Sequence, residues 1–110
     1  MSYEYEDLRK EPMPEYAQKI NAVIIDSLDR YAMSGCPTGG FLRAVLEHDL
    51  FAAFNLSDDD NSLLMRDLVM YIHNRLPATC HGSPEDVDAW IKNGGIKGGE
   101  EFERRLRAAR

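Results

Sequence analysis

SGCPTGGF, at residues 34–41, is the stretch that decides how this chain folds, because it ends one predicted helix and begins the next. Gly35 suits the cap after a helix C-terminus, and Thr38-Gly39-Gly40 forms a turn that can start a new helix. A second stretch, ATCHGSPE at residues 78–85, has the same layout. Each turn leaves backbone N–H groups free at a helix N-terminus, where an anion or carboxylate can be held.

Apolar residues recur at three- and four-residue steps on both sides of these turns, which is the spacing of one helical face. We predict helices over residues 14–33, 38–54, 59–76 and 84–93. The helix over 38–54 has the densest apolar set and is predicted to be central, with Leu46 buried. No alternating apolar run predicts a strand. We therefore predict an all-α fold, a compact four-helix domain over residues 13–95.

The two ends of the chain differ from this domain. Residues 1–12 are charged and lack a sustained apolar period, which predicts a loose N-terminal arm. Residues 96–110 begin with a glycine-rich linker and end in a short helix whose acids come early and whose arginines come late, as the helix dipole favours. Only Phe102 and Leu106 could be buried there, so this additional helix is predicted to be weakly held.

Composition limits the function classes. The chain has 110 residues and a formal net charge of -6, which argues against general nucleic-acid binding, since phosphate affinity depends on Lys and Arg. No apolar run approaches the ~20 residues of a membrane span, and the acidic N-terminus does not resemble a signal peptide. We expect a cytoplasmic protein without membrane association. Its two cysteines are then expected to be free thiols.

Metal and nucleophile chemistry are both disfavoured. Cys36, Cys80 and His81, with His48 or His73, could in principle form a zinc site, but their spacing matches no common zinc-binding pattern. The alternative, that the cysteines are small buried apolar residues, is favoured. Cys80 and His81 are neighbours on a turn and rarely face each other in that arrangement, so we predict no nucleophilic pair. We predict no metal, no cofactor and no enzymatic activity.

The candidate ligand site combines the two turns. Thr38, Gly39 and Gly40 would let an anion approach the backbone, and Arg43 would supply a charged fork one turn later. His81 and Ser83 of the second turn would join them, because we expect the helices over 38–54 and 59–76 to be antiparallel neighbours. A structural alternative stays open: the glycines would allow close helix packing, and Arg43 would pair with Glu47.

Several segments together resemble a family of small proteins encoded by bacteriophages and prophages. These segments are GCPTGGFLRAVL at 35–46, Asp49-Leu50, Leu76-Pro77, Cys80, Gly82-Ser83-Pro84 and Trp90. The resemblance covers residues 14–93, implies a phage accessory role and supplies no catalytic residue.

The leading functional hypothesis combines this resemblance with the composition. Aromatic and methionine residues exceed what one thin core needs, which favours protein contacts and a homo-oligomer. We expect a counter-defence protein that binds a host defence protein in the host cytoplasm without catalysis. Two alternatives remain: a sponge that sequesters an anionic nucleotide second messenger, or a small structural or regulatory phage protein.

Overall fold

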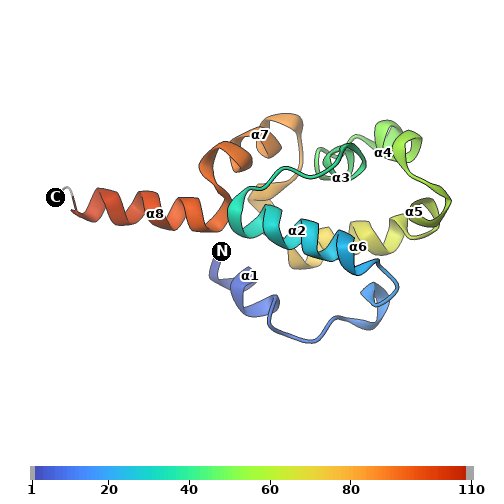
Figure 1. Ribbon diagram of the computed structural model, residues 1–110, viewed down its shortest axis with the longest axis horizontal. Coiled ribbons are helices and arrows are strands. Elements are labelled where there is room, and N and C mark those ends of the chain that lie inside the picture. Colours follow the sequence, from blue (N-terminus) through green and yellow to red (C-terminus); the bar gives the residue numbers. More distant parts are fainter. Residues whose placement is uncertain (1, 109–110) are drawn as a thin grey trace.

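Helices form the regular structure of the chain between residues 2 and 108, the part that the computed structural model describes, with side chains from Tyr5 onward (Figure 1). The described residues contain no strand, and the all-α prediction is confirmed. The number of helices is larger than predicted. In chain order the elements are α1 (Ser2–Leu8), the 3-10 turn η1 (Glu15–Ala17), α2 (Ala22–Ser34), α3 (Gly40–Leu46), α4 (Leu50–Leu56), α5 (Asp59–Leu63), α6 (Met65–Arg75), the 3-10 turn η2 (Ala78–Cys80), α7 (Pro84–Asn93) and α8 (Gly95–Ala108).

The predicted helix over 14–33 is wrong in its first turns. The side chain of Asn21 accepts a hydrogen bond from the backbone N–H of Val23 at 2.8 Å, which is the geometry of an N-cap. The helix α2 therefore begins at Ala22, and only a 3-10 turn precedes it. Its end is as predicted, because Gly35 adopts φ 69° and donates its N–H to the carbonyl of Tyr31.

Two further predicted helices are each divided in two. The helix over 38–54 breaks at His48, whose φ of 62° lies in the left-handed region, and Asp49 then caps α4 by accepting from the N–H of Ala52. The helix over 59–76 is interrupted at Leu64, between α5 and α6.

The core is built around α2. Leu28, Tyr31 and Leu46 are fully buried, so the predicted central position of Leu46 is confirmed. The Tyr31 hydroxyl donates to the carbonyl of Cys80 at 2.6 Å, and the indole Nε1 of Trp90 donates to the carbonyl of Tyr31 at 2.9 Å. One residue thereby joins α2 to η2 and to α7.

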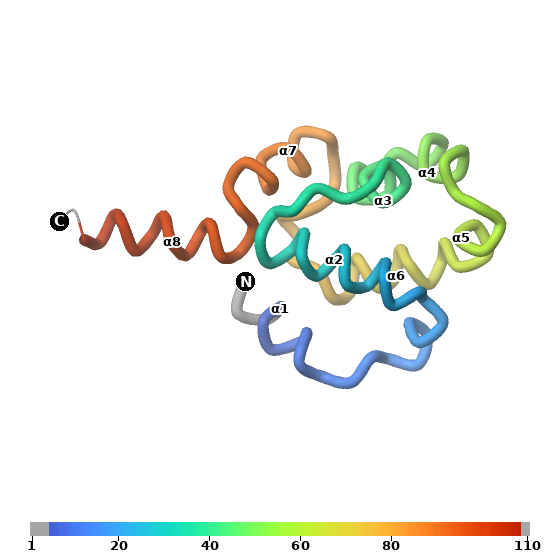
Figure 2. Tube along the Cα trace, viewed as in Figure 1, coloured from blue at the N-terminus to red at the C-terminus, as the bar shows by residue number. Residues whose placement is uncertain are grey.

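The N-terminal segment is a docked helix, so the prediction of a loose arm is wrong. Tyr5 of α1 is buried, and its hydroxyl donates to Oδ1 of Asp29 on α2 at 2.6 Å. Arg9 adds two hydrogen bonds to the same carboxylate, at 2.8 and 2.6 Å. After α1 the chain runs along one side of the molecule before it turns back into α2 (Figure 2).

The glycine-rich segment predicted as a linker over 96–99 is helical, because α8 begins directly at Gly95. Gly35 and Gly95 allow this junction: a Cβ added to Gly95 would lie 2.6 Å from the backbone nitrogen of Gly35, so the two backbones touch. Ile96 is buried, which fixes the start of α8, whereas its outer turns extend away from the other helices (Figure 1). Arg110, part of the predicted short helix, lies outside the described residues.

Candidate functional site

The first turn leaves Thr38, Gly39 and Gly40 at the N-terminal end of α3. The Thr38 hydroxyl bonds to the carbonyl of Gly39 at 3.2 Å. Open space surrounds the position of a Cβ on Gly39, and a Cβ on Gly40 would make only an ordinary contact with Leu56 at 3.8 Å. Close helix packing therefore does not require these two glycines, contrary to the structural alternative considered above.

Arg43 is engaged by acidic side chains. Its Nε donates to Glu47 at 2.7 Å, as the four-residue spacing predicts, and its Nη2 donates to Asp88 of α7 at 2.8 Å. Asp88 and Glu47 raise the pKa of Arg43, and Arg43 lowers the pKa of Asp88. The guanidinium fork therefore ties α3 to α7, and two carboxylates already balance its charge.

The second turn lies at the opposite end of α3 from the first. The N–H of Gly82 donates to the carbonyl of Leu46, the last residue of α3, at 2.9 Å. The helix α3 has seven residues, so Gly40 and Leu46 lie about 9 Å apart along its axis. Ser83 is also occupied, since its hydroxyl oxygen accepts from the N–H of Asp86 at 3.1 Å. The structure therefore does not gather Thr38, Gly39 and Gly40 with His81 and Ser83 around one point.

His81 has a different neighbour. Its Nδ1 lies 2.8 Å from Nε2 of His48, and the two ring centroids are 5.1 Å apart. Burial, followed by the charges of His48 and His73, lowers the pKa of His81. Two neutral imidazoles can share one proton in this contact, with one ring donating and the other accepting. Sequence reasoning placed these two histidines together only as one option for a zinc site. It did not predict a direct contact, which forms where the left-handed backbone at His48 brings its ring to a residue 33 positions later.

The cysteines are both free thiols, as predicted. Cys36 is exposed on the first turn, whereas Cys80 is fully buried, so the expectation that both are buried is wrong for Cys36. Burial raises the pKa of the Cys80 thiol to about 12. That thiol is therefore protonated at neutral pH and is a poor nucleophile. Among the side chains that the structure describes, from Tyr5 to Ala108, no group of three or more His, Cys, Asp or Glu could hold a metal ion.

The surface of α4 is unexpectedly apolar. Leu50, Phe51 and Phe54 lie within one side of this helix and are 62%, 80% and 45% exposed. We name these three residues the α4 face. The prediction of one central helix over 38–54 is wrong for this half, because the bend at residues 47–49 leaves α3 in the core and turns α4 outward.

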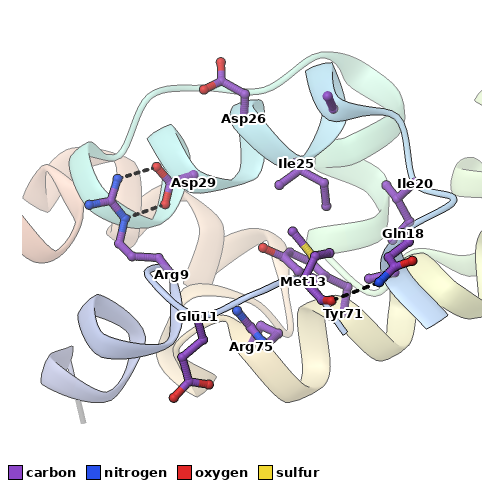
Figure 3. A pocket seen from close by; sticks show the side chains of 12 residues that line it. Arg9, Glu11, Met13, Gln18, Ile20, Ile25, Asp26, Asp29, Tyr71 and Arg75 are labelled. Atoms are coloured by element: carbon purple, nitrogen blue, oxygen red, sulfur yellow. Dashed lines mark hydrogen bonds and ion pairs between the residues drawn. The ribbon is translucent and has the colours of Figure 1, made fainter. Parts of the chain in front are cut away.

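A pocket of about 440 Å³ lies between the N-terminal segment, α2 and α6 (Figure 3). Figure 3 shows the Arg9 and Asp29 pair at one end and Met13, Ile25 and Tyr71 gathered in the middle. The cationic groups on its wall are already bonded: Arg9 to Asp29, and Arg75 to the carbonyl of Leu8. Arg9, Glu11 and Met13, in the segment after α1, form one wall of this pocket. The sequence analysis expected residues 1–12 to be a loose arm, so this wall was not predicted.

Comparisons of this chain with protein-family models, with curated proteins and with solved structures find no match. Among the helices of the described residues, none is both long enough and apolar enough to cross a membrane.

Proposed function

We propose that this protein acts without catalysis, by binding a host protein through the α4 face. The observation that carries the proposal is the exposure of Leu50, Phe51 and Phe54 on one short helix. Apolar surface left in water is unfavourable by about 25 cal/mol for each Å², and a cluster of this kind commonly marks a protein contact. Phe51 is the natural anchor, since aromatic side chains often dominate binding energy.

The charges beside the α4 face suggest the chemistry of the partner. Asp49 precedes α4, and Asp58, Asp59 and Asp60 follow it. Acidic residues on both sides of an apolar centre suit a partner with an apolar pocket and a basic rim. Such charge complementarity would speed association with the partner at low salt, and the association rate should fall as the salt concentration rises.

The biological setting in this proposal comes from the resemblance to phage-encoded proteins. A small accessory protein that covers the working surface of a host defence component, in the host cytoplasm, would block it without chemistry. The protonated Cys80 thiol fits such a role. The nucleotide sponge has weaker support, because Arg43 is bonded to two carboxylates and the two turns lie at opposite ends of α3.

The test compares capture of host proteins by the wild type, Phe51→Ser and Val69→Ser. Val69 of α6 is another exposed apolar residue and serves as the matched control. We expect the wild type and the control to retain the same host protein, and Phe51→Ser to bind the purified partner about 30-fold more weakly, as for an interface residue worth ~2 kcal/mol. Equal binding by Phe51→Ser would refute the role of the α4 face.

A nucleotide titration tests the alternative. We expect calorimetry with cyclic and linear nucleotides to show no binding. Micromolar binding by the wild type that Arg43→Ala abolishes would instead favour the sponge and overturn protein binding as the main role.

A further inference from the structure

The outer part of α8 presents an apolar stripe that has no partner among the described residues. Gly95, Gly99, Phe102 and Leu106 follow one another at steps of four, three and four, the spacing of a helix-pairing seam. Gly95 is buried against the body of the protein, whereas Phe102 and Leu106 are 63% and 46% exposed. The same side of α8 that packs against the other helices at Gly95 is therefore exposed further along, where α8 extends away from those helices (Figure 1).

We propose that this stripe pairs with the α8 stripe of a second copy of the chain, with the two helices antiparallel. The argument for a second copy is charge complementarity. Glu100, Glu101 and Glu103 come first along the outer part of α8, and Arg104, Arg105 and Arg107 come after them. An antiparallel pair places the acidic half of each helix beside the basic half of the other, whereas a parallel pair places like charges at the same level.

The register follows from the helix rise of about 1.5 Å per residue. A two-fold axis at the level of Arg104 sets Phe102 opposite Leu106 of the second copy. Glu101 then lies within about 3 Å, measured along the axis, of the level of Arg105 of the second copy. On the other side of the seam, Arg107 of the second copy falls between the levels of Glu100 and Glu103. The complementary contacts across the seam are therefore Glu101 with Arg105 and Glu103 with Arg107. The same axis sets Glu103 and Arg105 each within about 3 Å, along the helix, of the same residue of the second copy, so the complementarity comes from the outer pairs.

The contacts within one helix are compatible with this pairing. Glu101 and Arg105 form an ion pair at 2.7 Å, and Glu103 and Arg107 approach to 4.0 Å. These pairs run along the helix and are exposed, so each contributes little by itself. A second helix would extend each of them into a network across the seam, where ion pairs contribute more to specificity.

A groove at the inner end of the stripe has room for the second helix. It has a volume of about 700 Å³ and lies between α7 and α8, with Trp90, Gly98, Gly99 and Phe102 among its lining residues. The two glycines contribute no side chains, so the groove stays open. The end of the second α8 would cover Trp90 and Phe102 there.

The expected dimer is weak. Two helix ends bury less than the ~1,200 Å² of total surface that marks the lower limit of a standard interface. We therefore expect reversible dimerisation at roughly tens to hundreds of micromolar, and protein concentrations up to about 1 mM are needed to observe it. The pairing uses a different surface from the α4 face, so either proposal can fail without the other.

Sedimentation equilibrium tests the dimer. We expect a concentration-dependent monomer–dimer equilibrium for the wild type, and dimerisation at least tenfold weaker for Phe102→Ser and for Leu106→Ser. Phe51→Ser is the matched control, since it removes an exposed phenylalanine outside α8 and should leave the equilibrium unchanged. Circular dichroism checks that each variant is folded. A wild type that stays monomeric, or a dimer that only Phe51→Ser disrupts, overturns the proposal.

A spin label on α8 tests the orientation. Lys97 is exposed, and Lys97→Cys in a Cys36→Ser background gives one accessible thiol, because Cys80 is buried. Lys97 lies on the side of α8 opposite the stripe, so two helices of about 11 Å diameter separate the labels by about 22 Å across a parallel pair. The antiparallel pair adds about 21 Å along the helix axis, which gives a total of about 30 Å. An electron–electron distance distribution centred at about 30 Å or beyond supports the antiparallel register, and one centred at about 22 Å or below overturns it.

Discussion

Alanine at Gly98 should damage the protein, whereas alanine at Gly99 should not. A Cβ on Gly98 would lie 1.8 Å from the carbonyl oxygen of Asn93, while a Cβ on Gly99 would have no atom within 4 Å. The positions of the added Cβ and of the Asn93 carbonyl oxygen are both fixed by the backbone, so no side-chain rotation can relieve this clash. The Gly98→Ala variant can be accommodated only if α8 moves away from the end of α7.

The magnitude follows from two opposing effects. Overpacking a tight contact costs about 1–3 kcal/mol and occasionally more, and this contact is more severe than most. Replacing a helical glycine by alanine gains up to about 1 kcal/mol. We therefore expect Gly98→Ala to lower the free energy of unfolding by about 1–3 kcal/mol and Gly99→Ala to raise it by up to about 1 kcal/mol.

Urea unfolding followed by tryptophan fluorescence measures both effects. Trp90 is the sole tryptophan and lies at this junction, bonded to the carbonyl of Tyr31. Its emission should shift to longer wavelength in Gly98→Ala before global unfolding, as the junction opens, and should be unchanged in Gly99→Ala. Equal stabilities for the two variants would mean that the close approach of α7 and α8 is not a feature of the folded protein.

Three further perturbations test the core and the docking of α1. Tyr31→Phe should lower the free energy of unfolding by about 1–3 kcal/mol, measured in urea, because it leaves the carbonyl of Cys80 without its donor. Leu46→Ala should lower it by about 2–5 kcal/mol, and a loss below about 0.5 kcal/mol would contradict a central α3. Arg9 lowers the pKa of Asp29, so the carboxylate stabilises the fold above its unfolded pKa of about 3.9 and loses that effect as the pH falls through its lower folded value. Asp29→Asn should therefore be less stable than the wild type at pH 7, with the difference shrinking below pH ~4; a difference independent of pH would contradict the ion pair.

The sequence by itself determined the helical class and several helix ends. Ser83 caps α7, Asp58 caps α5 and Gly35 ends α2, and each of these was readable because a cap bonds to a backbone group no more than four residues away. The Arg43–Glu47 pair was predictable for the same reason, since a helix brings residues four apart together.

The tertiary structure decided where the long apolar segments divide and which of their residues reach the surface. The apolar periodicity continues from α3 into α4, so the local sequence pattern did not predict that Phe51 is exposed while Leu46 is buried. The bend at His48 depends on what each half packs against, which is a property of the whole chain.

The tertiary structure alone also decided the site. Asp88 reaches Arg43 from 45 residues away, and His48 meets His81 across 33 residues. These contacts bond Arg43 and His81, two residues of the predicted anion site, to side chains that were not part of that site. The segment predicted as a loose charged arm is likewise a docked helix, because Tyr5 and Arg9 bond to Asp29 on α2. Local sequence patterns predict bonds between residues a few positions apart. Contacts between residues far apart in sequence form only when the helices pack around the core and bring those residues together.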